Sequence, residues 1–325
     1  MSSKVFDSAA LPVKQWNDPS VLVKLRWSGV NFYEFVLPNG KTIVMDPYFD
    51  DPNDAHNEYK YTPTDLPAGE WVNGADVILL THGHFDHTGN LAEVLEKYPD
   101  AHIIIPEHTI PSVIVDQNVD YFSHYFTEAG AHDMFEFDGV TIETCRSNHN
   151  IGRAVNPLKR AGVDPNGRLY EDENGNVDFF KIWKWIYERE LMNLKITTEE
   201  GFTILLWNSQ MGADGIGYET RKYFYRDAQP DLFMYQVAGA SFGGNRRNPD
   251  CGPMGRFIAE VKAKTAVPEH QQHFSYDELD KMAEKFAACC DEAGQETTFL
   301  TPETGVWYGY SKDENGNVTV CRIEK

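Results

Sequence analysis

The stretch from Asp76 to His87, Asp-Val-Ile-Leu-Leu-Thr-His-Gly-His-Phe-Asp-His, is the most informative part of the chain. Its apolar beginning predicts a short buried strand. Three histidines and an aspartate follow within six residues. On a continuing strand His82 and His84 face the same side, and a turn into a helix brings Asp86 and His87 toward the same point. Imidazole and carboxylate together suit zinc, manganese or iron. The alternative is a polar loop with three histidines by coincidence, which the chain's total of 11 histidines disfavours.

The segments around this stretch predict a strand–loop–helix–strand unit, which places the histidines at the carboxyl end of a strand, where α/β sheets bind their ligands. Asn39-Gly40 is a turn signal between two of the earlier strands. The expected strands are 21–27, 32–36, 42–46, 76–80 and 102–105, and the expected helix is 91–98.

The second half of the chain repeats this order, so we expect one domain over residues 1–325 with two βα halves. Asp138-Gly139 predicts a hairpin turn, and residues 1–19 look polar and irregular. A loop and an aromatic helix form an expected insertion at about 151–194. The other expected elements are strands at 134–144, 194–198, 202–207, 230–237 and 297–323, and helices at 252–263 and 276–293.

The composition limits the classes of function. With 325 residues and 41% hydrophobic content, the chain can bury a sizeable core. Its formal charge of −21 disfavours nucleic acid and anionic membrane surfaces as partners. No apolar run approaches the length of a membrane helix, and the five cysteines form no CxxC pair. We therefore expect a cytoplasmic protein with reduced thiols and a small-molecule substrate. Assembly into a homo-oligomer is compatible with this composition.

The run from His82 to His87 resembles the HxHxDH signature of the metallo-β-lactamase superfamily, which is specific when it follows an apolar strand. The resemblance extends over roughly residues 21–305. It implies an αββα sandwich with the metal site at one edge, between two mixed sheets. Among the branches, the layout looks most like the ascorbate-phosphate lactonase-like enzymes and the N-acyl-phosphatidylethanolamine phospholipases.

This resemblance also implies two sets of metal ligands. His149 looks like the third histidine of the first site, and Pro268-Glu269-His270 resembles the motif that supplies the last histidine. One divalent ion is then held by His82, His84 and His149, and the other by Asp86, His87 and His270. Zinc is the first expectation, with manganese or iron as alternatives and one or two ions bound.

The chain departs from the superfamily pattern at one ligand. The family has a bridging aspartate after the strand that corresponds to residues 202–207, but here Gln210 or Asn208 falls at that place. A neutral amide does not offset the repulsion between two dications. Asp214 is an alternative bridge if its loop is rearranged. We therefore expect the second ion to bind more weakly than the first.

These residues predict hydrolysis of a small polar ester, lactone, amide or phosphoester by metal-bound hydroxide. Asp86 and His270 are the expected catalytic groups, since Asp86 can both bind an ion and orient the nucleophile. The alternative is a catalytically altered relative that binds or senses a small ligand, with Gln210 marking the lost activity.

Several other residues are candidates for supporting roles. Asp46 either accepts a hydrogen bond from a metal-binding imidazole or caps a turn before Pro47. His273, Arg153 and Trp183 are possible substrate contacts, and surface exposure is the alternative for Arg153. The aromatic segment that contains Trp183 is either a helix packed on the core or a lid over the site.

Overall fold

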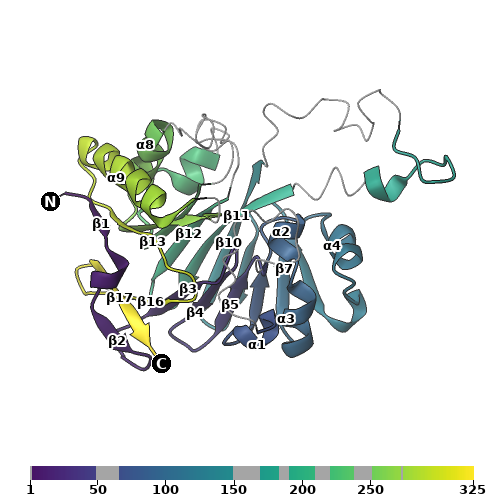
Figure 1. Ribbon diagram of the computed structural model, residues 1–325, viewed down its shortest axis with the longest axis horizontal. Helices are drawn as coiled ribbons and strands as arrows, with labels where there is room; N and C mark the ends of the chain where they lie inside the picture. Colours follow the sequence, from purple (N-terminus) through teal and green to yellow (C-terminus); the bar gives the residue numbers. More distant parts are fainter. Residues whose placement is uncertain are drawn as a thin grey trace.

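Two β-sheets pack face to face in this protein, and helices cover the outer face of each (Figure 1). The computed structural model describes residues 2–48, 66–148, 169–182, 190–208, 220–237, 251–271 and 274–325. Within these residues the four layers are helix, sheet, sheet and helix, which confirms the expected αββα sandwich.

The first sheet has nine strands in the order β2-β17-β16-β3-β4-β5-β6-β7-β8. Strands β3, β4 and β5 are antiparallel neighbours, whereas β5 to β8 are parallel. The strands are β2 (Val13–Gln15), β3 (Val23–Trp27), β4 (Tyr33–Val36), β5 (Thr42–Met45), β6 (Val77–Leu79), β7 (His102–Pro106), β8 (Tyr125–Ala129), β16 (Trp307–Lys312) and β17 (Val318–Glu324).

The second sheet has eight strands in the order β1-β15-β14-β13-β12-β11-β10-β9. Asp138 and Gly139 turn β9 into β10 with positive φ angles of 31° and 81°, as a two-residue hairpin requires. The strands are β1 (Lys4–Phe6), β9 (Met134–Phe137), β10 (Val140–Asn148), β11 (Glu190–Thr198), β12 (Thr203–Trp207), β13 (Leu232–Gln236), β14 (Thr265–Glu269) and β15 (Thr298–Leu300).

Helices α1 (Ala68–Trp71), α3 (Leu91–Lys97) and α4 (Ile110–Asp116) cover the first sheet, and α8 (Cys251–Val261) and α9 (Tyr276–Glu292) cover the second. Ser275 and Glu278 form a capping box that begins α9. Short helical turns are α2 (Phe85–Thr88), η1 (Ser8–Ala10), η2 (Tyr121–Ser123) and η4 (Arg221–Tyr225).

Three apolar layers hold these elements together. Leu25, Phe35 and Met234 belong to the layer between the sheets. Leu91 and Val94 pack α3 onto the first sheet, and Phe257 and Phe286 pack α8 and α9 onto the second. Each helix therefore buries one apolar stripe against the outer face of a sheet.

The carboxyl ends of β5, β6, β12 and β14 lead to polar residues at one edge of the sandwich. Asp46 follows β5, Thr81 to His87 follow β6, Asn208 follows β12, and His270 follows β14. Because β5 is parallel to β6, and β12 and β14 are each parallel to β13, their carboxyl ends lie at the same edge of each sheet. This arrangement brings distant parts of the sequence to one place.

Two expectations from the sequence are wrong in detail. The N-terminal segment is not all irregular, because β1 pairs with β15 and β2 pairs with β17. Strand β11 begins at Glu190, so the aromatic helix does not extend to Leu194. Both errors arise because the partner strands, which are distant in sequence, provide the stabilising hydrogen bonds. In Figure 1 the described residues 169–182 of the insertion project away from the sheets.

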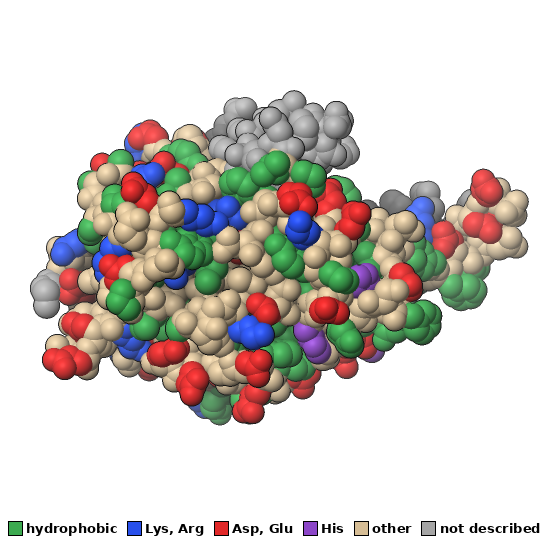
Figure 2. Space-filling model, turned by 90° about the horizontal axis from the view of Figure 1, so that it is seen from below, with side chains coloured by type: hydrophobic (Ala, Val, Ile, Leu, Met, Phe, Trp, Pro, Cys, Tyr) green, Lys and Arg blue, Asp and Glu red, His purple; other side chains and the backbone are tan. Residues whose placement is uncertain are grey.

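The face of the molecule drawn in Figure 2 shows scattered charge rather than a basic patch. In the view of Figure 2, lysine and arginine side chains stand in small separate groups among acidic and apolar ones. In the described part of the chain, no helix combines the length and the apolar character needed to cross a bilayer.

Candidate metal centre

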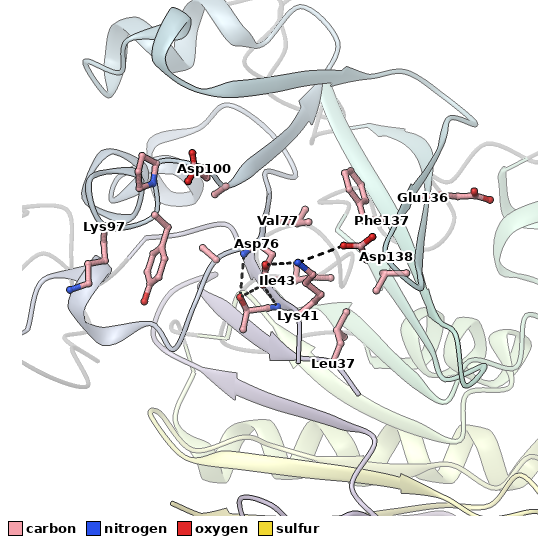
Figure 3. Close-up of a pocket in the computed structure, with 16 residues that line it drawn as sticks. Leu37, Lys41, Ile43, Asp76, Val77, Lys97, Asp100, Glu136, Phe137 and Asp138 are labelled. Carbon is pink, nitrogen blue, oxygen red and sulfur yellow. Dashed lines mark hydrogen bonds and ion pairs between the residues drawn. The ribbon is translucent and has the colours of Figure 1, made fainter. Parts of the chain in front are cut away.

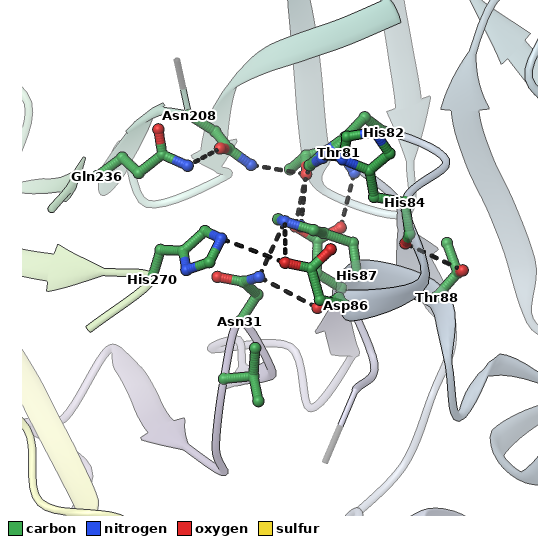
Figure 4. Close-up of polar contacts among 12 residues, drawn as sticks. Asn31, Thr81, His82, His84, Asp86, His87, Thr88, Asn208, Gln236 and His270 are labelled. Atoms are coloured by element: carbon green, nitrogen blue, oxygen red, sulfur yellow. Dashed lines mark hydrogen bonds and ion pairs between the residues drawn. The ribbon is translucent and has the colours of Figure 1, made fainter. Parts of the chain in front are cut away.

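The loop after β6 places its four polar side chains around one point. His82 Nε2 lies 3.1 Å from His84 Nδ1, and the ring centroids of His82 and His87 are 3.8 Å apart. His82 and His87 are completely buried, whereas the carboxylate side chain of Asp86 is 43% exposed. The loop therefore brings two buried imidazoles and a partly exposed carboxylate to the same place (Figure 4).

Asp46 holds the ring of His87 from behind. Its Oδ2 lies 2.7 Å from His87 Nδ1, and its Oδ1 accepts a hydrogen bond from the backbone N–H of Thr81 at 2.7 Å. The Thr81 hydroxyl also donates to Asp46 Oδ2, at 2.6 Å. The contact with Asp46 occupies Nδ1 of His87, so Nε2 is the ring nitrogen that faces the site. Asp46 thus lies against the ring of His87 and also fastens the start of the loop after β6, rather than capping the turn before Pro47.

His270 reaches the same point from the other sheet. Its Nε2 lies 3.4 Å from Asp86 Oδ2, and His87 Nε2 lies 3.9 Å from that oxygen. Partial burial acts to raise the pKa of Asp86, but His87 and His270 stabilise the carboxylate and hold this pKa well below its usual range. The carboxylate is therefore ionised at neutral pH.

The donor set fits a divalent metal ion. One ligand atom from each of Asp86, His87 and His270 lies within 4.8 Å of the others. Two atoms bound to one ion are each about 2.1 Å from it, so separations of roughly 3 to 4 Å are those of shared ligands. The structure thus brings together Asp86, His87 and His270, with His82 and His84 beside them.

A buried chain of amides supports the loop from the second sheet. Gln236 donates to Asn208 Oδ1 at 2.9 Å, and Asn208 donates through Nδ2 to the Thr81 hydroxyl at 2.6 Å. Both ends of the Asn208 amide are therefore engaged behind the ligands. Of the two residues considered for the missing aspartate, Asn208 supports Thr81, and Gln210 lies outside the described residues.

The other candidate residues from the sequence also lie outside the described residues. They are His149, Arg153, Trp183, Asp214 and His273. Their assignments remain predictions, as does the lid over the site.

Four neighbours of the site were not expected from any sequence motif, and they are Asn31, Thr81, Gln236 and Glu269. Asn31 donates to the backbone carbonyl of Asp86 at 3.1 Å, from the loop between β3 and β4. Amide and hydroxyl side chains of this kind belong to no recognisable sequence motif. Only their position near a strand end beside the candidate ligands would have separated them from other polar residues.

Glu269 is a buried carboxyl group next to His270. It is completely buried, and neither carboxyl oxygen has a hydrogen-bond partner among the residues that the structure describes. Burial, together with the nearby carboxylates of Asp46 and Asp86, raises the pKa of Glu269 to about 8, although His87 opposes this. The group is therefore largely protonated in the folded protein at neutral pH.

We expect the unmodified protein to lose stability as the pH rises toward 8, and we expect Glu269→Gln to remove this loss. Between its ordinary pKa of 4.5 and about 8, the folded state binds a proton that the unfolded state releases, so the free energy of unfolding falls as pH rises. From pH 5 to pH 8 this loss is on the order of 3 kcal/mol. Urea unfolding of chelator-treated protein at both pH values measures it. Parallel pH profiles for the variant and the unmodified protein would contradict the expectation.

A separate cavity of about 530 Å³ lies at the amino ends of β5 and β6 (Figure 3). Lys41 bridges Asp76 at 3.0 Å and Asp138 at 3.8 Å at its wall. Asp86 and His87 follow the carboxyl end of β6, and Asp46 follows that of β5, at the opposite edge of the sheet. This cavity is thus separate from the metal centre.

Comparison with known sequences agrees with this geometry. Residues 28–177 match the Metallo-beta-lactamase superfamily. A UPF0173 metal-dependent hydrolase of Geobacillus thermodenitrificans is 27% identical over 187 residues, which cover 55% of this chain and 75% of that protein. Another, of Herpetosiphon aurantiacus, is 36% identical over 160 residues, which cover 47% of this chain and 58% of that protein. Among four such relatives, the share of the relative's length that is matched ranges from 32% to 75%.

Solved structures share the fold at low sequence identity. The metallo-beta-lactamase fold protein YhfI of Bacillus subtilis has a TM-score of 0.50 and 13% identity, covering 92% of this chain and 99% of that one. Yeast PDE1 has a TM-score of 0.55 and 8% identity, covering 88% of this chain and 99% of that one. Its match over residues 28–177, its αββα sandwich and its HxHxDH loop make this chain similar to the metallo-β-lactamase superfamily and to relatives named metal-dependent hydrolases.

Proposed function

We propose that the protein is a metal-dependent hydrolase that acts on a small polar ester, lactone, amide or phosphoester. The strongest support is the convergence of Asp86, His87 and His270 from two sheets at one edge of the sandwich. Relatives named metal-dependent hydrolases support the same class of reaction. The formal charge of −21 favours a small molecule over nucleic acid as the substrate.

The residues around the site have separate tasks in this proposal. Asp86, His87 and His270 hold one divalent ion, and His82 and His84 belong to the other, with zinc, manganese and iron as candidates. When bound, such an ion lowers the pKa of a coordinated water toward about 7 and polarises the bond to be cleaved. Asp46 fixes the ring of His87, and the chain from Gln236 through Asn208 to Thr81 keeps the loop in place.

Removing the metal tests this function directly. We expect chelator-treated protein to lose roughly 100-fold or more of its hydrolytic rate, because no side chain at the site replaces the Lewis acid. The assay uses p-nitrophenyl acetate, a γ-lactone and bis-p-nitrophenyl phosphate, followed by reloading with Zn²⁺, Mn²⁺ or Fe²⁺. Hydrolysis that is unaffected by the chelator would rule out the proposal.

The second candidate function is binding or sensing of a small ligand without turnover. The neutral residues Asn208 and Gln210 at the place of the bridging aspartate favour it, because they weaken the attraction for a second dication. Metal content measured in the same preparations separates the two functions. Tight metal binding without hydrolysis of any substrate class supports the sensor, and recovered turnover supports the enzyme.

A further inference from the structure

Asn31 directs its side-chain amide at the ligand atoms of the metal centre. Its Nδ2 lies 2.9 Å from His87 Nε2, the ring nitrogen that Asp46 leaves available. Figure 4 shows Asn31 and His270 on the same side of Asp86, each pointing toward it. A separation of 2.9 Å is close to the spacing of two ligands that share one ion, since each is about 2.1 Å from it.

The other end of this amide is unpaired within the described part of the chain. Asn31 is completely buried, and among the described residues its Oδ1 accepts no hydrogen bond. A buried carbonyl oxygen left unpaired costs about 1–3 kcal/mol, so most such groups are satisfied. Turning the amide by 180° exchanges two atoms of similar size and places Oδ1 beside His87 Nε2.

Hydrogen bonds fix the strained turn that carries Asn31. The preceding residue, Val30, has a φ of 37°, a left-handed value that is rare for a β-branched side chain. The Trp27 indole donates to the carbonyl of Val30 at 3.0 Å, and Ser28 N donates to the carbonyl of Phe32 at 2.8 Å. Strain of this kind persists where the surrounding structure enforces it, commonly at functional sites.

We propose that Asn31 is a fourth ligand of the ion held by Asp86, His87 and His270, binding it through the side-chain oxygen. A divalent ion attracts the oxygen end of the amide dipole and repels the NH₂ end. This attraction outweighs the single neutral hydrogen bond from Nδ2 to the Asp86 carbonyl, because that bond contributes only about 1 kcal/mol. Carbonyl oxygen is also a harder ligand than imidazole, so Asn31 shifts the preference of the site toward Mn²⁺ relative to Zn²⁺.

Metal binding to chelator-stripped protein tests this assignment, which rests on the metal centre proposed above. Titration calorimetry with Mn²⁺ and with Zn²⁺ gives both affinities, and Asp86→Ala identifies the binding step that belongs to this site. We expect Asn31→Ala to weaken Mn²⁺ at that step roughly 10-fold or more, and Zn²⁺ by less. Asn31→Asp, which keeps both terminal positions and adds charge, should strengthen both ions and remains informative if Asn31→Ala does not fold.

Asn193→Ala is the matched control. Asn193 is also completely buried with one amide end unpaired among the described residues, but its Oδ1 accepts from Asn208 N, and it has no hydrogen bond to Asp86, His87 or His270. Its loss should leave the ratio of Mn²⁺ to Zn²⁺ affinity unchanged. Tighter metal binding in Asn31→Ala would show that the amide competes with the ion. An unchanged ratio of Mn²⁺ to Zn²⁺ affinity in that variant would show that Asn31 has a structural role only. Either result overturns the proposal. If the Asp86→Ala variant keeps every metal-binding step of the unmodified protein, the proposed metal centre itself is wrong.

Discussion

Asp86→Ala is expected to reduce hydrolysis by about 1,000-fold or more and to remove one bound ion, while the fold remains intact. Asp86 is the anionic member of its ligand set, so its loss leaves only neutral donors to attract a dication. Its side chain is 43% exposed, so truncation opens no cavity in the core. Turnover, metal content by plasma emission spectrometry and thermal unfolding check the three parts of this expectation.

Asp138→Ala is the matched control for this variant. Asp138 is also an exposed aspartate, but it lines the cavity at the amino ends of β5 and β6. We expect its loss to leave turnover and metal content unchanged. If Asp138→Ala impairs hydrolysis and Asp86→Ala does not, the reaction takes place in that cavity and not at the metal centre.

Asp46→Asn is expected to weaken metal binding 10- to 100-fold, although it changes a single oxygen to nitrogen. Asp46 accepts hydrogen bonds from the Thr81 backbone at one oxygen and from His87 Nδ1 at the other. An amide provides an acceptor at only one of these places. If its NH₂ group faces the Thr81 N–H, that backbone donor loses its acceptor. If the NH₂ group instead faces His87 Nδ1, the ring is forced into the tautomer with its hydrogen on Nε2.

Stability and metal affinity together check this second variant. Because Asp46 is completely buried, leaving one donor unpaired should also lower the free energy of unfolding by about 1–3 kcal/mol. Calorimetric titration with Zn²⁺ and urea unfolding measure the two effects. Unchanged metal affinity in Asp46→Asn would show that Asp46 acts only as a turn cap.

The sequence alone predicted those features of the fold that depend on local chemistry. The apolar run before Thr81 predicted β6, and the turn residues Asn39-Gly40 and Asp138-Gly139 predicted two hairpins that are present. The helix over 276–293 followed from its amphipathic pattern and is found at Tyr276–Glu292. These signals are visible in the sequence because they depend on residues that are neighbours along the chain.

Candidate metal ligands that lie together in the structure could be named from the sequence only where a motif links residue type to spacing. The spacing of His82, His84, Asp86 and His87 is such a motif, and the resemblance to a known superfamily added His270, which the structure places 3.4 Å from Asp86. The edge strands β1 and β2 were missed, because their short polar segments become strands only through pairing with β15 and β17.

What the sequence determined by itself was the order of strands and helices and the loop that carries the candidate ligands, because local periodicity and spacing predict both. The αββα sandwich was implied by the resemblance to a known superfamily. The tertiary structure alone decided which polar side chains support that loop. Asn208 meets Thr81 across 127 residues of chain, and Asn31 meets His87 across 56. Asparagine is common at strand ends and in turns, so no pattern of residues distinguishes these two. Only the packing of the two sheets brings their amides to the ligands, because hydrogen bonds between distant segments form when burial has already fixed the distance between them.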